Sequence, residues 1–392
     1  MKYWRGYIVA ALVAVFTGAL MLFAEAHTVL VDMIYPYVTR LIQGSLAGWA
    51  ATTDICLWQL FVVLMGVILL ATVVLMIVLR WNPIQWGGWV LAAASFLFCL
   101  HTGVYGLNTY AGPLADDIRM NTQTEEYMAA EIAEATTYFR DIANELARQV
   151  PRNPDGSLNY PSFEELANMA GNGFENLVYG DKTYAVFAGS TIPVKKLGWA
   201  DMYTSMGITG VHMPLTGEAA VNPQTPAVAL PFTMCHEMSH RMCIAVERDA
   251  NMGAFLACDA NDNVIFRYSA YFMAFRYCYN SLVAKGTSAA ISAANDIYDG
   301  IDSLLMQDLN DYKEFFQKHQ DQNATNLANK ANDTYIKVSG DAQGVASYET
   351  VGDLLVGWYI QEIYLPAHKD EEQVFDPLDK NQIDLTPSVN GG

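Results

Sequence analysis

One short stretch of the chain combines metal-binding residue types with a spacing that brings them together: His236-Glu237-Met238-Ser239-His240. Residues four apart on a helix lie on one face, so the imidazoles of His236 and His240 can bind a single cation. Zinc is the metal expected for this pair, and a glutamate between the histidines lies where it can take a proton from water. The stretch therefore predicts a zinc site with His236 and His240 as ligands and Glu237 as general base.

A catalytic zinc usually has a third protein ligand, and two acids follow the histidines, Glu247 and Asp249. An unbroken helix would separate Glu247 from His240 by about 10 Å, because each residue adds about 1.5 Å. We therefore predict that the chain turns between them and begins a second helix near Ala245. On that helix Glu247 and Asn251 share a face while Asp249 points away, so Glu247 is the preferred ligand and Asn251 its hydrogen-bonding neighbour. The alternative role of Glu247 is that of an acid favoured at a helix N-terminus.

The segment before these helices is rich in turn residues and predicts a small β-region at 182–231. Residues 207–214, which include Gly210 and His212, are expected to form an edge strand that binds an extended peptide by strand addition. Residues 216–222 are expected at the rim of the same cleft. A capped surface hairpin is the alternative for both segments, and His212 is expected to be a strand residue rather than a ligand.

Four further residues near the motif have predicted roles. Arg267 or Tyr268 can stabilise the oxyanion of a tetrahedral intermediate, although core packing is the preferred role of Tyr268. Thr233 is expected to be the N-cap of the first metal-binding helix. Cys243 is expected to be a small buried side chain, with thiolate coordination of the metal as the alternative.

The charge distribution divides the chain into an apolar part and an acidic part. Of the 392 residues, 52% are hydrophobic and only 16% are charged, and the net charge is −19. Residues 1–110 contain four basic and three acidic residues, whereas the rest contains 18 basic and 38 acidic residues. An acidic surface repels phosphate, which excludes a nucleic-acid partner. We therefore predict a membrane anchor at 1–110, a globular domain at 111–367 and a polar tail at 368–392.

Three apolar stretches in the anchor are long enough to cross a bilayer: residues 6–24, residues 57–79 and a stretch that begins near residue 86. Cleavage of the first stretch as a signal peptide is the alternative. None of the three contains a buried charge, which argues against a channel or transporter. Lys2, Arg5 and Arg80 fall on one side and Arg40 on the other, so the positive-inside tendency predicts a multi-pass protein of the cell membrane with an extracytoplasmic domain.

The pattern of apolar residues in the domain is mainly helical. Helices are predicted at 121–150, 160–180, 232–258, 268–282, 288–318 and 348–363. The fold class is therefore mainly α: three transmembrane helices, then a helical domain with a small β-region before the metal-binding helix. Disulfides are permitted outside the cytoplasm, but the sequence does not select a pairing among the four cysteines of the domain.

Several segments give the chain a specific resemblance. The histidine motif followed by Glu-x-x-Ala-Asn resembles the glutamate-type zincins. The chain is also similar to a bacterial membrane-protein family catalogued as domain of unknown function 3810, in the segments VYGLNTYAGPL (104–114), GITGVHMPLTGEAAVN (207–222), LPFTMCHEMSHRMCIAVERDAN (230–251), FRYSAY (266–271) and NDTYIKVSGDAQGVASYETVGDLL (332–355). The resemblance implies a membrane-anchored, zincin-like metallopeptidase with zinc on His236, His240 and Glu247. Relatives usually have glycine where this chain has Cys243, at a turn where a non-glycine residue is strained by about 1 kcal/mol.

Two functions from different classes are compatible with these features. The first is a zinc peptidase at the membrane that cleaves peptide or protein substrates, with Glu237 activating water. The second is a non-catalytic membrane sensor or scaffold of zincin fold that binds peptides or envelope components. Retention of Glu237 favours the first function, because a structural zinc site does not require a general base.

Overall fold

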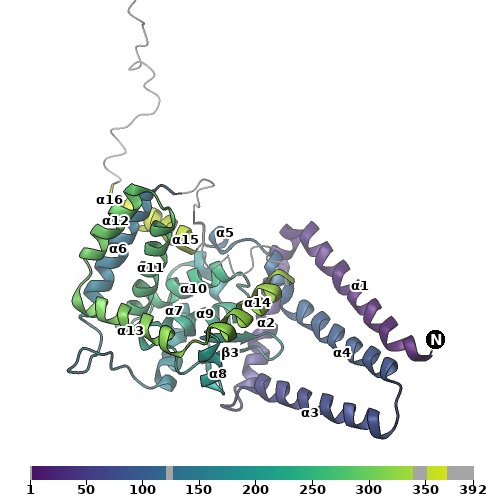
Figure 1. Ribbon diagram of the computed structural model, residues 1–392. Helices are drawn as coiled ribbons and strands as arrows, with labels where there is room; N and C mark the ends of the chain where they lie inside the picture. The colour runs from purple at the N-terminus through teal and green to yellow at the C-terminus, as the bar shows by residue number, and fades with distance from the viewer. Residues whose placement is uncertain (1, 121–126, 339–350, 369–392) are drawn as a thin grey trace, which may run out of the picture.

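The computed structural model describes residues 2–120, 127–338 and 351–368, and Figure 1 shows a helical domain with three long helices projecting from it. These helices are α1 (Arg5–Ala26), α3 (Leu57–Val78) and α4 (Pro83–Val104), and all three are long and apolar enough to cross a membrane. They coincide with the three predicted spans. The N-terminus and the turn between α3 and α4 lie at the end of the spans far from the domain (Figure 1).

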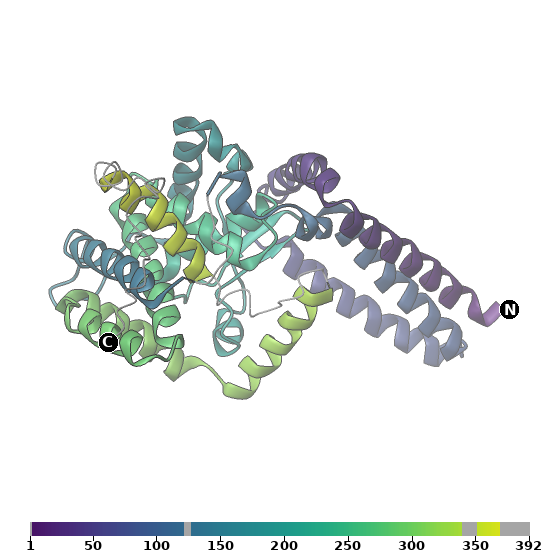
Figure 2. The same cartoon turned by 90° about the horizontal axis from the view of Figure 1, so that it is seen from above.

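A fourth long helix of the N-terminal region, α2 (Thr28–Ala50), runs crosswise to the spans at their domain end (Figures 1 and 2). The sequence pattern predicts no element for this segment. Its polar residues explain why: Asp32, Arg40 and Gln43 interrupt the apolar run that marks a span. Arg40 and Gln43 are buried against the domain, so the helix is stabilised by packing that a hydropathy pattern does not reveal.

The domain is built from helices packed around a central pair, α10 and α11, with a core rich in aromatic rings such as Phe139, Phe255 and Trp358. The longer helices pack side by side around this core in Figure 1. The helices are α5 (Leu114–Asp117), α6 (Ala129–Ala147), α7 (Phe163–Gly180), α8 (Ala200–Ser205), α9 (Leu230–Arg241), α10 (Glu247–Asp259), α11 (Val264–Ala284), α12 (Ser288–Asp299), α13 (Ser303–His319), α14 (Gln322–Val338), α15 (Val351–Tyr359) and α16 (Leu365–Ala367).

The predicted helices are mostly present, with different bounds. The helix expected at 160–180 is α7, and the one expected at 268–282 lies within α11. The segment 232–258 contains two helices, α9 and α10, with the predicted break between them. The segment 288–318 contains two helices rather than one. Helix α6 begins only at Ala129, and residues 121–126, 348–350 and 369–392 of the predicted elements lie outside the described residues. Helices α8 and α14 were not predicted.

The small β-region is a three-stranded sheet in the order β1-β3-β2, with β1 (Lys195–Lys196), β2 (Gly210–Met213) and β3 (Glu218–Val221). Strand β3 is parallel to β1 and antiparallel to β2. Strand β2 is therefore an edge strand, as predicted for 207–214. The expectation for 216–222 is wrong: this segment is not a rim loop but contains the buried central strand, because its small apolar side chains pack beneath α9.

Buried polar contacts join the sheet to the membrane helices. The carboxylate of Glu218 in β3 accepts hydrogen bonds from the first two backbone N–H groups of α3, those of Leu57 at 2.8 Å and Trp58 at 2.9 Å. Such groups have no partner within their own helix. Lys195 in β1 donates to the backbone carbonyl of Ala50, the last residue of α2, at 2.7 Å. The sheet is thus fixed to the end of α2 and to the start of the candidate span α3.

Candidate metal centre

Helix α9 presents His236 and His240 on one face, as the spacing predicts. The helix begins earlier than expected, at Leu230, and its N-cap position is Ala229. Thr233 is therefore not the N-cap but lies within the first turns, where its hydroxyl donates to the carbonyl of Ala229 at 3.0 Å. A proline at the start of the helix stabilises this earlier beginning, because its missing N–H would have no partner there.

The chain turns sharply between α9 and α10, as predicted from the distance that a straight helix would impose. Cys243 is the pivot of this turn, with a φ of 71° in the left-handed region. Its thiol is buried and is not among the atoms that cluster between the two helices. Burial raises the pKa of this thiol to about 11, which favours the neutral form. The predicted role of Cys243 as a small buried side chain agrees with this placement.

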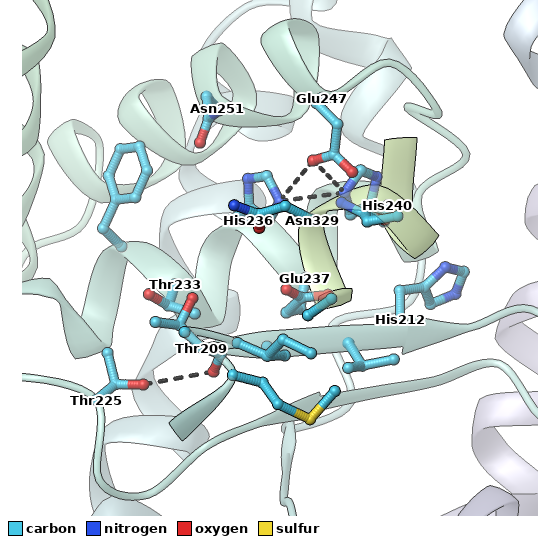
Figure 3. Close-up of a pocket in the computed structure, with 18 of the residues that line it drawn as sticks. Thr209, His212, Thr225, Thr233, His236, Glu237, His240, Glu247, Asn251 and Asn329 are labelled. Carbon is cyan, nitrogen blue, oxygen red and sulfur yellow. Dashed lines mark hydrogen bonds and ion pairs between the residues drawn. The ribbon is translucent and has the colours of Figure 1, made fainter. Parts of the chain in front are cut away.

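The turn brings Glu247, the first residue of α10, back to the two histidines. The Nε2 atoms of His236 and His240 lie 3.1 Å apart, and Oε2 of Glu247 lies 3.2 Å and 3.3 Å from them. Their candidate ligand atoms all lie within 4.8 Å of one another. In Figure 3 the three side chains point toward a common centre.

The backbone selects the tautomer of His240. Its Nδ1 lies 2.8 Å from the backbone carbonyl of Ile244, in the turn. A carbonyl only accepts hydrogen bonds, so in the neutral ring the proton resides on Nδ1 and the lone pair of Nε2 faces the cluster. This is the form in which a histidine binds a metal ion through Nε2.

The electrostatics of the cluster reflect burial and charge pairing. Burial favours the neutral form of Glu247, but the neighbouring His240 and His236 outweigh it and hold the pKa of this carboxyl well below its usual value. Burial disfavours a charge on His240, but Glu247 outweighs it and raises the pKa of His240 to about 9. Burial raises the pKa of Glu237 to about 7. Glu247 is therefore the charged carboxylate of the cluster, and it favours a positive charge beside it.

Glu237 lies between the cluster and strand β2 (Figure 3) and is 5% exposed. The backbone of Gly210 passes so close that a Cβ atom there would lie 2.2 Å from Oε1 of Glu237. Any side chain at position 210 would thus displace the carboxylate. The role of Gly210 is to leave room for Glu237, and its strand also borders the cavity.

The cluster opens into a cavity of about 720 Å³, a size typical of ligand sites. One wall is the free edge of β2, and the opposite wall comes from α10 and α11. Asn251 of α10 lies above His236 in Figure 3, and its Oδ1 accepts a hydrogen bond from the hydroxyl of Tyr277 at 3.3 Å. Tyr277 was not identified from the sequence, because nothing in its local spacing relates it to Asn251. Within the described part of the chain, the Nδ1 of His236 and the Nδ2 of Asn251 are buried without a hydrogen-bond partner.

The remaining candidates lie outside the cluster. His212 lies on β2 at the side of the cavity, its ring 6.3 Å from that of His240, as a strand residue rather than a member of the ligand cluster. Tyr268 is fully buried, and its hydroxyl donates to Asp308 in the core. Arg267 is nearest to Asp259, at 4.0 Å. Neither Arg267 nor Tyr268 lines the cavity, so the geometry does not support the oxyanion role considered for them. The burial of Tyr268 agrees with the core-packing role that was preferred for it.

Comparison with known proteins gives one family. A family model described as Protein of unknown function (DUF3810) matches residues 31–356, a range that includes most of α2, two of the candidate spans and the whole cluster. No curated protein and no solved structure matches the chain.

Proposed function

The chain belongs to the family described as Protein of unknown function (DUF3810), and we propose that it is a membrane-anchored zinc peptidase. The observation that most supports this function is the convergence of His236, His240 and Glu247, with Glu237 beside them in the same cavity. A purely structural site has no need for a second, uncoordinated carboxylate next to an open cavity.

The residues fit zinc by their chemistry. Two imidazoles and one carboxylate are a ligand set of catalytic zinc sites, which leave a further position open. The hydrogen bond from His240 to Ile244 orients the ring with Nε2 toward the cluster. Asn251 lines the same cavity, and the hydroxyl of Tyr277 donates a hydrogen bond to its Oδ1. When bound, zinc acts as a Lewis acid toward a carbonyl oxygen and lowers the pKa of water.

Residues of the chain itself carry out proton transfer and substrate binding. Glu237 accepts a proton from the water molecule that attacks the peptide carbonyl and then passes it to the departing amine. Gly210 keeps that carboxylate in place, because no side chain occupies the space between β2 and α9. The edge strand β2 binds the substrate as an added strand, since it is paired on one side only and its residues line the cavity. The substrate is therefore bound in an extended conformation.

We place the peptidase domain outside the cytoplasm. Lys2, Arg5 and Arg80 lie at the end of the spans far from the domain, and basic residues are enriched on the cytoplasmic side of membranes. The domain lies at the other end, together with α2. A protease-protection assay on intact cells tests this orientation through cleavage of the exposed domain.

Metal content and peptide cleavage test the function on the full chain purified in detergent. Wild-type protein is expected to hold about one zinc per chain and to cleave members of a mixed-peptide pool. Glu237→Gln is expected to keep the zinc and to cleave about 100-fold or more slowly. Glu247→Ala is expected to lose zinc. Glu314→Gln, an exposed residue of α13, is the matched control and should behave as wild type.

Each variant can contradict a separate part of the proposal. Full zinc content in Glu247→Ala would show that this residue is not a ligand. Zinc in every variant with no cleavage by any of them would support the non-catalytic sensor or scaffold instead. Unchanged cleavage in Glu237→Gln would remove Glu237 as the general base.

A further inference from the structure

Helix α2 exposes a face that is unusual for a helix in water. Its most exposed side chains include Leu41 at 75%, Met33 at 67% and Tyr37 at 61%. None of the exposed residues of this helix is charged: its two charged residues, Asp32 and Arg40, are half-buried and buried. A solvent-facing helix normally carries its charged residues on the exposed side. Contiguous apolar surface of this kind marks an interaction site.

The neighbours of this face identify what covers it. α2 follows the candidate span α1 after a single residue and leads, through a short loop, into the candidate span α3. It lies across the domain ends of the three spans in both views (Figures 1 and 2). Helices that lie in a membrane interface have one apolar face, and Tyr and Trp settle at headgroup level. Tyr37 and Trp49 lie on the exposed side of α2.

The same helix makes direct contacts with the candidate metal centre. Arg40 donates from Nε to the carbonyl of Met242, in the turn after His240, at 3.2 Å. Gln43 donates from Nε2 to the carbonyl of Pro214, at the end of strand β2, at 3.1 Å. Both the turn between the ligand helices and the edge strand are thus held against α2.

The cavity also begins at the end of a membrane span. His101, in the last turn of α4, lines it, and so do Tyr105 and Gly106 just beyond the end of that helix. A single wall therefore continues from the span into the cavity. A peptide bound along β2 has one end next to this wall.

We propose that α2 lies in the lipid headgroup layer and that the cavity begins at the membrane surface, so that the substrates are segments of membrane-anchored proteins close to the bilayer. The position of α2 stands independently, whereas the substrate class rests on the proposed peptidase function. Lipid covers the exposed face of α2. The opposite face, through Arg40 and Gln43, holds the turn between α9 and α10 and strand β2 at a constant height above the bilayer.

A depth measurement tests the position of α2 without any catalysis. The full chain is reconstituted into phosphatidylcholine vesicles with a fluorophore on Leu41→Cys, or on Tyr179→Cys of α7 as a matched exposed control. Doxyl-labelled phosphatidylcholine is expected to quench most of the signal at position 41 and little at position 179. Labelled wild-type protein gives the background from Cys99, which is not fully buried. Quenching at position 41 by aqueous iodide, but not by the doxyl lipid, would overturn the proposed position.

A substrate with two identical sites tests the substrate class. A peptide block that the protein cleaves in the mixed-pool assay is placed twice in one acylated chain, about 8 and about 30 residues from the lipid anchor. Flexible linkers of these lengths reach about 16 Å and about 30 Å. A cavity at the membrane surface is expected to cut the near site about tenfold faster, because effective concentration falls with linker length. The Glu237→Gln variant gives the background rate of cleavage at both sites.

The outcomes separate the two proposals. Equal cutting of both sites, or faster cutting of the far site, would overturn the membrane-proximal substrate class and leave the peptidase function intact. Absence of any cleavable block in the pool contradicts the peptidase function itself. The depth result at position 41 supports or overturns the position of α2 in either case.

Discussion

Glu218 and Lys195 form an ion pair with a 2.8 Å separation at the junction between the sheet and the membrane helices. Their side chains are only 1% and 11% exposed. Both charged groups have further hydrogen-bond partners. Glu218 also accepts from the first backbone N–H groups of α3, and Lys195 also donates to the carbonyls of Ala50 and Ile55. One buried pair thus connects two strands with the ends of two helices.

Removal of one partner from this pair should be costly. Glu218→Ala is expected to lower the free energy of unfolding by about 3–5 kcal/mol, because it leaves the Lys195 ammonium buried and unpaired. Arg148→Ala, which breaks an exposed ion pair with Asp302, is the control and should cost about 1 kcal/mol or less. Guanidinium titration of tryptophan fluorescence in detergent micelles measures both. Equal losses in the two variants would contradict a structural role of the buried pair.

Gly210 should be required for cleavage but not for metal binding. In Gly210→Ala the new Cβ would lie 2.2 Å from Oε1 of Glu237, so the carboxylate must move. A displacement of about 1 Å at a catalytic group can slow a reaction about 100-fold, and we expect a loss of this size with unchanged zinc content. Gly180→Ala, where no atom lies within 4 Å, is the control. Full activity in Gly210→Ala would show that Glu237 tolerates the shift.

Cys243 should be replaceable by glycine. Cys243→Gly removes the strain of the left-handed conformation, about 1 kcal/mol, and also removes a small buried side chain. We expect the two effects to offset each other and the zinc content to stay at the wild-type level. Cys243→Val should lower the free energy of unfolding by about 2 kcal/mol or more, because a β-branched residue is poorly tolerated at positive φ. Loss of zinc in the glycine variant would instead support the thiolate as a ligand.

Asp259 should make the fold more stable at low pH. Burial raises its pKa, and it is the last residue of α10, where the helix dipole disfavours a negative charge. The folded state therefore binds the proton more tightly than the unfolded state, and the contribution of this group falls as the pH rises through the folded pKa. Asp259→Asn is expected to have a higher thermal midpoint than wild type at pH 7, with the difference vanishing below about pH 4.

Asp181 provides a control of opposite sign. Hydrogen bonds from the backbone and side chain of Thr183 lower its pKa, so its charged form stabilises the fold. Asp181→Asn should lower the thermal midpoint at pH 7, and the deficit should shrink as the pH falls. A common pH dependence in both variants would mean that net charge, rather than these local environments, controls stability.

Short-range patterns in the sequence predicted the spans and much of the site arrangement. Twenty apolar residues without a charge suffice to indicate a span, and histidines four apart must share a helical face. The rise of a helix required a turn before Glu247, and the structure has that turn. Strand β2 was also recognisable, because turn residues and alternating side chains mark its segment.

Other features depend on contacts between distant segments. Helix α2 is not recognisable from its own sequence, because its buried Arg40 and Gln43 find their partners in the turn after α9 and next to β2. Helix α14 contains several asparagines, which are weak helix formers, and it lines the cavity through residues such as Asn329. The approach of Gly210 to Glu237 and the bond from Tyr277 to Asn251 join residues 27 and 26 positions apart, which no local pattern reveals.

The last turn of α4 has a consequence for how the protein responds to its lipids. Membrane helices adapt to thicker or thinner bilayers mainly by tilting. A tilt of α4 would move His101 relative to β2, because His101 belongs both to this helix and to the lining of the cavity. In the membrane arrangement that we propose, bilayer thickness therefore influences where this side chain stands in the cavity.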